Sequence, residues 1–219
     1  DVNNSPATNI FNNTIQNTGS NGISLNPSPG SVIADNTISN FGDNSYGIYV
    51  LNSDDVRVIA NDIVGGGVDQ VGIGDDDVTI FKVIWTNICI PFGCFSVPVP
   101  SFVTDYNGND VSNVAMGVVL SGTTDATVRN NDITNIGLNG ISSFDASGLL
   151  AIEDNIVDTT GEDGIHLEVF KNTVITDNRV RNTGNDAIFA DGYNDIGAGF
   201  SARLEGNDVD HVGDGGIYV

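Results

Sequence analysis

Short apolar stretches alternate with polar turns along this chain, and one pattern returns every 22 to 29 residues. The segments "VRNNDITNIGLNGISSF" (128–144) and "ITDNRVRNTGNDAIFAD" (175–191) show it clearly. Both read apolar, two residues, Asn, one residue, apolar, a turn, and then a small residue before an apolar one. Most of the apolar residues are β-branched and no apolar period of 3.6 is sustained, so the pattern predicts short strands rather than helices.

The Asn in this pattern occurs in nine copies. They are Asn13, Asn36, Asn61, Asn87, Asn109, Asn131, Asn155, Asn178 and Asn207. At every copy, the residues three before, two after and about ten after the Asn are apolar or Cys. Because so short a unit cannot bury its own apolar face, the units must stack into a solenoid. We expect Ile and Val columns inside, and an Asn at each bend that permits the bend and bonds to its copies above and below.

The pattern covers almost the whole chain and resembles the parallel β-helix repeats of the pectate-lyase-like superfamily. The resemblance implies an all-β, right-handed parallel β-helix with three strands per coil, as one domain over residues 1–219 with about nine coils. It implies no single activity, because this fold hosts lyases, hydrolases, epimerases, adhesins and structural fibres. The sequence enters its first apolar column almost at once and stops inside a strand. We therefore expect a segment of a longer chain, or one that associates end to end through its strand edges.

The acidic net charge of the chain limits the kinds of ligand that it can bind. Seven basic residues face 29 acidic ones, for a formal net charge of -22. Such a chain repels nucleic acid and is unfavourable for anionic substrates. No membrane span or targeting segment is found in the sequence, and we expect no membrane insertion and an extracellular or cell-surface location.

The stretch "FKVIWTNICIPFGCFSVPVPSF" (81–102) departs from the repeat although it still fits the coil pattern. Trp85, Phe92 and Phe95 fall at sites that are polar or small in other coils, which predicts a contact surface, including one for self-association. The alternative is a local apolar loop folded over the solenoid. Cys89 and Cys94 would close a disulfide in an oxidising compartment, or Cys89 would remain a reduced buried thiol.

A second departure from the repeat is the loop "DGYNDIGAGF" (191–200), which predicts an exposed excursion that either walls a groove or has no role.

A third departure from the repeat is a cluster of polar and aromatic residues. His166, Phe189 and Tyr218 are expected to share an outward column on three successive coils, where they would bind a sugar ring. Asp163 lies over Asp186 beside them.

These two carboxylates, with His166 and nearby Lys171, are the candidates for acid–base catalysis. The alternative is that His166 is an ordinary solvent-facing strand residue.

Carboxylates also recur at equivalent positions on neighbouring coils. Asp110 stacks on Asp132, and Asp154 on Asp177, in this alignment. Like charges so close would repel, so Ca²⁺ is the cofactor that the sequence suggests, if any.

Two classes of function remain. The regular ladder and the lack of a convergent site favour a structural or binding solenoid, such as a surface protein, adhesin or fibre segment. The alternatives are a polysaccharide lyase, epimerase or hydrolase, and a carbohydrate-binding module. Catalysis is disfavoured because the chain shows no pectate-lyase motif, no paired-Asp hydrolase arrangement and no His-containing motif of the alginate epimerases.

Overall fold

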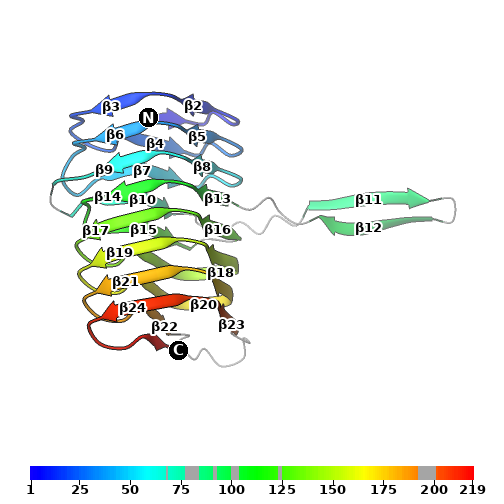
Figure 1. Ribbon diagram of the computed structural model, residues 1–219. Coiled ribbons are helices and arrows are strands. Elements are labelled where there is room, and N and C mark those ends of the chain that lie inside the picture. The colour runs from blue at the N-terminus through cyan, green and yellow to red at the C-terminus, as the bar shows by residue number, and fades with distance from the viewer. Residues whose placement is uncertain (68, 77–83, 91–92, 100–103, 123–124, 192–200) are drawn as a thin grey trace.

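A computed structural model describes residues 1–67, 69–76, 84–90, 93–99, 104–122, 125–191 and 201–219. The side chains of 76, 84–90, 93–99, 147, 169 and 171 are outside this description. The chain winds into a solenoid with three faces, built from parallel strands (Figure 1). The described residues contain no helix long and apolar enough to cross a membrane.

Each coil contributes one strand to each face, in the chain order first, second, third. The first face holds β1 (Val2–Asn3), β4 (Ile23–Asn26), β7 (Tyr46–Leu51), β10 (Val71–Asp76), β15 (Met116–Ser121), the first parts of β18 (Ile141–Glu153) and β20 (Ile165–Thr176), β22 (Ile188–Asp191) and β25 (Ile217–Tyr218). The second face holds β2 (Asn9–Phe11), β5 (Val32–Ala34), β8 (Arg57–Ile59), β13 (Thr104–Asn107), β16 (Ala126–Arg129), the later parts of β18 and β20, and β23 (Ser201–Glu205). The third face holds β3 (Thr14–Gln16), β6 (Thr37–Ser39), β9 (Asp62–Val64), β14 (Asp110–Ser112), β17 (Asp132–Ile136), β19 (Ile156–Thr160), β21 (Arg179–Thr183) and β24 (Asp208–Val212).

The predicted apolar columns are confirmed. On the third face Ile38 lies beside Ile63, which lies beside Val111 and then Ile133, in register from coil to coil. These side chains are fully buried, as are most residues in the matching columns of the interior coils on the other two faces. Stacking identical β-branched residues about 4.8 Å apart removes both neighbours' apolar surface from water, and this burial is the main stabilising term of the solenoid.

The Asn column is also confirmed, with one change to its explanation. Each Asn side chain donates to the amide oxygen of the next copy, as Asn131 does to Asn155 at 2.9 Å. The bend itself is made by the residue before the Asn, which adopts a left-handed conformation. These residues are Asn12, Asp35, Ala60, Gly108, Asn130, Asp154, Asp177 and Gly206. The ladder Asn therefore stabilises the turn, whereas its neighbour supplies the positive φ.

The expected coil at Asn87 is wrong. β11 (Ile84–Ile90) and β12 (Gly93–Val99) pair antiparallel with each other in a separate two-stranded sheet, drawn beside the solenoid in Figure 1. Cys89 and Val97 therefore do not occupy inward columns of a coil. The ladder runs directly from Asn61 to Asn109, and the third face has eight described strands.

Candidate functional site

Aromatic rings form a row on the outside of the first face. His166 stacks on Phe189 with 4.9 Å between ring centroids and 12° between planes. Phe189 stacks on Tyr218 at 5.0 Å and 5°. Phe144, two positions further along its strand, meets His166 at 6.1 Å with a tilt of 45°. The structure thus brings together His166, Phe189 and Tyr218 as predicted, and Phe144 extends their row by one coil.

Two carboxylates hold the imidazole of His166. Its Nδ1 lies 2.6 Å from Oδ2 of Asp163, and its Nε2 lies 3.1 Å from Oε1 of Glu168. Because carboxylates only accept hydrogen bonds, the protonated ring, which donates from both nitrogens, satisfies this geometry. Burial lowers the pKa of His166, but the hydrogen bonds to Asp163 and Glu168 and their charges raise it more, so the net pKa lies above its usual value.

The carboxylates of Asp163 and Asp186, also predicted for acid–base catalysis, accept hydrogen bonds from the backbone of neighbouring coils. Asp163 is buried, and its second oxygen accepts the backbone N–H of Asp186 at 2.9 Å. Asp186 in turn accepts the backbone N–H of Gly215 at 2.7 Å. Both carboxylates therefore fasten one coil to the next at the corner before the first face. Lys171 lies in β20, and its side chain is outside the described residues.

The ring orientation also decides what His166 can activate. Ser142 lies opposite His166 on the preceding coil, and its hydroxyl is buried with no hydrogen-bond partner in the structure. The His166 ring is nearly parallel to that of Phe189 on the following coil, so neighbours along the solenoid axis meet its ring faces rather than its nitrogens. A Ser–His–Asp arrangement, which requires the free ring nitrogen to face the hydroxyl, is not formed.

The predicted cation positions divide into two groups. Asp110 lies beside Asp132 as expected, and Asp62 lies on its other side because no coil intervenes. Burial raises the pKa of Asp110, and the charges of Asp132 and Asp62 raise it further. Asp154 and Asp177 are instead the left-handed residues of two successive bends. No group of three or more His, Cys, Asp or Glu in the described part of the chain is arranged to hold a metal ion, so the Ca²⁺ hypothesis stays a prediction.

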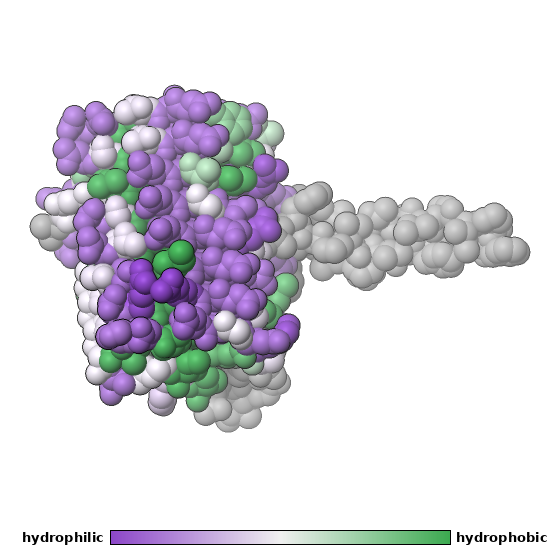
Figure 2. Space-filling model, in the orientation of Figure 1, coloured by the Kyte–Doolittle hydropathy of each residue, from purple (hydrophilic) through white to green (hydrophobic). Residues whose placement is uncertain are grey.

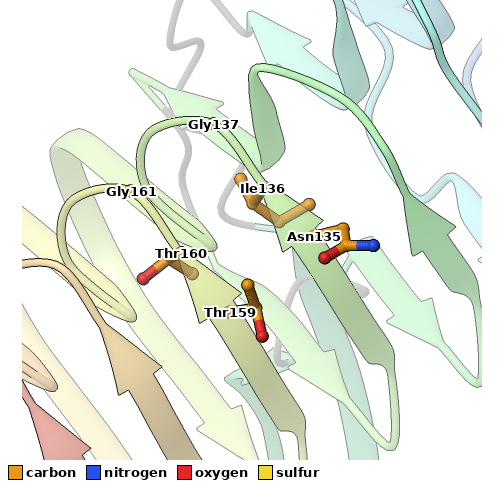
Figure 3. Close-up of a pocket in the computed structure, with 6 residues that line it drawn as sticks. All are labelled: Asn135, Ile136, Gly137, Thr159, Thr160 and Gly161. Carbon is orange, nitrogen blue, oxygen red and sulfur yellow. The ribbon is translucent and has the colours of Figure 1, made fainter.

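A shallow pocket lies at the corner after the third face. Figure 3 shows Asn135 and Thr159 on neighbouring strands, next to the loops at Gly137 and Gly161. Ile136 and Thr160 complete the lining. None of these six residues titrates near neutral pH, so the pocket offers no group for acid–base chemistry.

The third face itself is mainly hydrophilic, with apolar atoms in small groups (Figure 2). Its charges pair between coils. Arg181 contacts Asp158 at 2.8 Å, and hydrogen bonds from Asn182 and Arg181 outweigh the effect of burial and lower the pKa of Asp158. Such half-buried pairs at a surface contribute little to stability.

Three further predictions concern side chains or loops that are not described. The predicted contact surface at Trp85, Phe92 and Phe95 lies outside the described side chains. Residues 192–200 of the predicted loop at 191–200 also lie outside the described residues. The backbones of Cys89 and Cys94 lie opposite each other across the hairpin. Opposite residues of an antiparallel pair have Cα atoms about 4.5–5.5 Å apart, a separation that a disulfide can span, so this disulfide stays a prediction.

The fold is shared with known structures. One similar structure is the Azotobacter vinelandii mannuronan C-5 epimerase AlgE4 A-module, with a TM-score of 0.73 and 17% sequence identity. The match covers 98% of this chain and 56% of that structure. The AlgE6 A-module of the same organism matches over 98% of this chain and 55% of its own, with 14% identity and a TM-score of 0.66. The periplasmic alginate epimerase AlgG matches over 94% and 49%, with 16% identity and a TM-score of 0.59.

The chain thus spans about half the length of these structures, and at such low identity the likeness shows the fold alone. No curated protein sequence matches it. The family model for the right handed beta helix region matches residues 1–91 and 101–208, and its gap falls in the β11–β12 hairpin. The chain belongs to the right-handed β-helix family.

Proposed function

We propose that this chain is a polysaccharide-binding β-solenoid of an extracellular or cell-surface protein, and that the first face is its binding surface. One observation carries the proposal: a row of rings runs along the solenoid axis with carboxylates beside it. The row comprises Phe144, His166, Phe189 and Tyr218, from four successive coils. We call it the ring row.

The ring row suits a long ligand rather than a small one. Its rings stack on one another, so their edges, rather than most of their faces, meet solvent. Tyr218 is the most open, with 55% of the residue exposed. An extended sugar chain laid along the axis would pack its apolar edges against several rings in turn, and its hydroxyls would donate to the adjacent carboxylates. The stacked coils of the solenoid present these rings at regular intervals, as an extended sugar chain requires.

The same geometry favours binding over cleavage. A general acid or base needs a proton position that the substrate can reach. Both nitrogens of His166 are already within hydrogen-bond distance of Asp163 and Glu168, and Asp163 also holds the next coil. His166, Asp163 and Asp186, three of the four groups proposed for catalysis, are thus engaged in holding the surface together.

A polysaccharide lyase or epimerase is the second candidate. The cluster of His166 with two carboxylates favours it, since ligand binding can break the contact with exposed Glu168, whose side chain is 53% exposed. The structural likeness to proteins named as mannuronan and alginate epimerases also supports this alternative. Incubation with polymannuronate and other glycans would test it. New unsaturated sugar ends, or a changed ratio of sugar epimers by NMR, would replace the binding proposal with a catalytic one.

Self-association is a separate proposal that rests on the apolar residues of the hairpin. Trp85, Phe92 and Phe95 would provide its surface, within a segment that carries no charge from residue 83 to residue 103. Isolated two-stranded hairpins are marginally stable in water, so a partner would stabilise this one. Light scattering of the wild-type chain and of a triple serine variant tests it, and a wild-type monomer at high concentration would exclude it.

Glycan-array binding tests the main proposal. Wild-type protein should bind a defined set of polysaccharides, and Phe189→Ala should weaken that binding at least about tenfold, or ~1.4 kcal/mol. Phe11→Ala is the matched control, because Phe11 is an exposed Phe on the second face. Circular dichroism would establish that both variants fold. Equal binding by the two variants, or no binding by the wild type, would contradict the proposal.

A further inference from the structure

Positive charge is unevenly distributed over the three faces. Every arginine of the chain lies on the second or third face. These are Arg57, Arg129 and Arg203 on the second, and Arg179 and Arg181 on the third. Most are matched by acids there. Arg129, for example, makes two bonds to Asp105, at 3.0 and 2.9 Å.

The strands of the first face contain only acidic residues among their described charged side chains, apart from His166. A second column of positions runs beside that of His166, Phe189 and Tyr218, two residues further along each strand, and it includes Phe144 of the ring row. In this column Phe144 is followed by Glu168 and then by Asp191 on successive coils. Neighbouring strands lie about 4.8 Å apart, so the carboxylates of Glu168 and Asp191 are within reach of one cation. Glu168 and Asp191 are both exposed, so a ligand can reach them.

A buried polar group lies beneath this surface, next to His166. Ser142 lies directly opposite His166 on the preceding coil, in the column of His166, Phe189 and Tyr218. It is fully buried there, and its hydroxyl has no hydrogen-bond partner in the structure. Buried polar atoms without partners are rare in native proteins and commonly mark a site where water or a ligand completes the bonding. Because its hydroxyl is fully buried, only a water could complete its bonding, so Ser142 lies under the His166 end of the surface and makes no contact with the sugar chain.

From these observations we propose that the first face selects polysaccharides that carry free amino groups, such as chains of glucosamine. The inference rests on the proposed function and names its ligand class. Each sugar's apolar edge would lie along the ring row, and its ammonium group would pair with Glu168 or Asp191. An ammonium group near the rings would also gain a cation–π contribution. A polyuronate would instead bring its carboxylates against these acids, with no described arginine or lysine side chain on this face to pair with them.

Calorimetric titration with three matched oligomers tests this assignment. The probes are glucosamine, N-acetylglucosamine and mannuronate oligomers of equal length, at low and at physiological salt. We expect the glucosamine oligomer to bind most tightly, the acetylated one at least about tenfold more weakly, and the mannuronate oligomer without measurable heat. Glu168→Gln and Asp191→Asn should each weaken glucosamine binding by roughly three- to tenfold, since each removes one close charge.

A protein of net charge -22 attracts any polycation, so a control must separate the site from general attraction. Glu205→Gln removes one exposed carboxylate from the second face. Its glucosamine binding should match the wild type. Equal weakening by Glu205→Gln and Glu168→Gln would overturn the inference, because the attraction would then be general.

The remaining outcomes distinguish the inference from the function on which it rests. Tighter binding of the acetylated or the mannuronate oligomer, weakened by Phe189→Ala, would overturn the ligand class and leave the binding function intact. Absence of binding by all three oligomers would overturn the ligand class. If a broad glycan array were also negative, the binding function would be overturned with it.

Discussion

Asn61 donates its side-chain N–H to the amide oxygen of Asn109 at 3.0 Å, although 48 residues separate the two in sequence. The backbone N–H of Asn61 donates to the same oxygen, also at 3.0 Å. Two successive coils are therefore fastened to each other as if the β11–β12 hairpin inserted between β10 and β13 were absent. The solenoid core is continuous across this insertion, so changes in the hairpin should leave the coil ladder intact.

The interior of the Asn ladder should be critical for stability. Asn131 donates to the Tyr106 carbonyl and to Asn155, and its oxygen accepts two N–H groups of Asn109. Asn131→Ala would leave several of these buried groups unpaired and should lower the free energy of unfolding by about 2–4 kcal/mol. Denaturant unfolding measures this. Asn13→Ala, at an exposed end of the same ladder, is the control and should cost about 1 kcal/mol or less, whereas equal losses would contradict a role for burial.

A glycine precedes the inward Ile or Val in most coils of the first face and allows adjacent coils to approach. A Cβ on Gly140 would lie 2.4 Å from Cγ1 of Val157 and 2.6 Å from the Gly164 carbonyl oxygen. Because a backbone oxygen cannot move aside cheaply, Gly140→Ala should destabilise the fold by about 1–3 kcal/mol. Ala187 occupies the same column and carries its Cβ in a fully buried position.

Ala187→Gly is therefore the matched control, with an expected loss below about 1 kcal/mol. Thermal unfolding of both variants provides the comparison. A neutral Gly140→Ala variant would show that the coils can separate locally at no cost.

The acidic row on the third face should destabilise the chain at neutral pH. The pKa of Asp110 is raised by burial and by Asp132 and Asp62, so the folded state binds its proton more tightly than the unfolded state does. Stability therefore falls as the pH rises from about 3.9 through this raised pKa. Asp110→Asn should add about 0.2–1 kcal/mol at pH 7.

The gain should disappear as the pH falls through the raised pKa towards about 3.9. Unfolding of wild type and variant over this range measures the difference. Asp54→Asn, at an exposed site, controls for the loss of one charge. A gain that is independent of pH would contradict the electrostatic explanation.

His166 should stabilise the first face most strongly when protonated. Its folded pKa is raised, so its contribution is fully present below about pH 6.5 and is lost as the pH rises through the folded value. Charge-assisted hydrogen bonds of this kind contribute about 1.5–3 kcal/mol. The stability difference between wild type and His166→Gln should therefore shrink as the pH rises above about 6.5 and through the raised folded pKa.

The other histidine supplies the control. His211 is exposed, so His211→Gln controls for the loss of a histidine outside the first face. An NMR titration of the His166 ring gives an independent readout of its protonation. A wild-type protein whose stability relative to His166→Gln is flat over this range would contradict the carboxylate–imidazolium bridge.

The solenoid could be predicted because its stabilising interactions repeat. Ile133, Val157 and Val180 recur at spacings of 24 and 23 residues, and only stacking of coils buries them all. The hairpin could not be distinguished from a coil, because antiparallel strands also alternate apolar and polar positions. Ile84, Asn87 and Cys89 match the repeat by residue type, although their strand pairs elsewhere.

The sequence predicts which residues of the candidate site share a column, but it does not predict the hydrogen bonds that their side chains make. The shared column of His166, Phe189 and Tyr218 follows from counting coils. Occupation of both imidazole nitrogens depends on the side-chain rotamer of His166, which a sequence does not specify. Glu168 had a usable signal, since residues two apart on a strand point to the same side. The Asp62–Asp110 neighbours had none, because they are adjacent only if the segment between them forms no coil.

The most direct test of the first face as the binding surface is an amide NMR titration of the wild-type protein with a glucosamine oligomer. We predict shift changes concentrated on β18, β20 and β22, around Ser142, His166 and Phe189, that saturate with the oligomer. Changes confined to the third face or to the pocket at Asn135 and Thr159, with these three amides unaffected, would contradict the account.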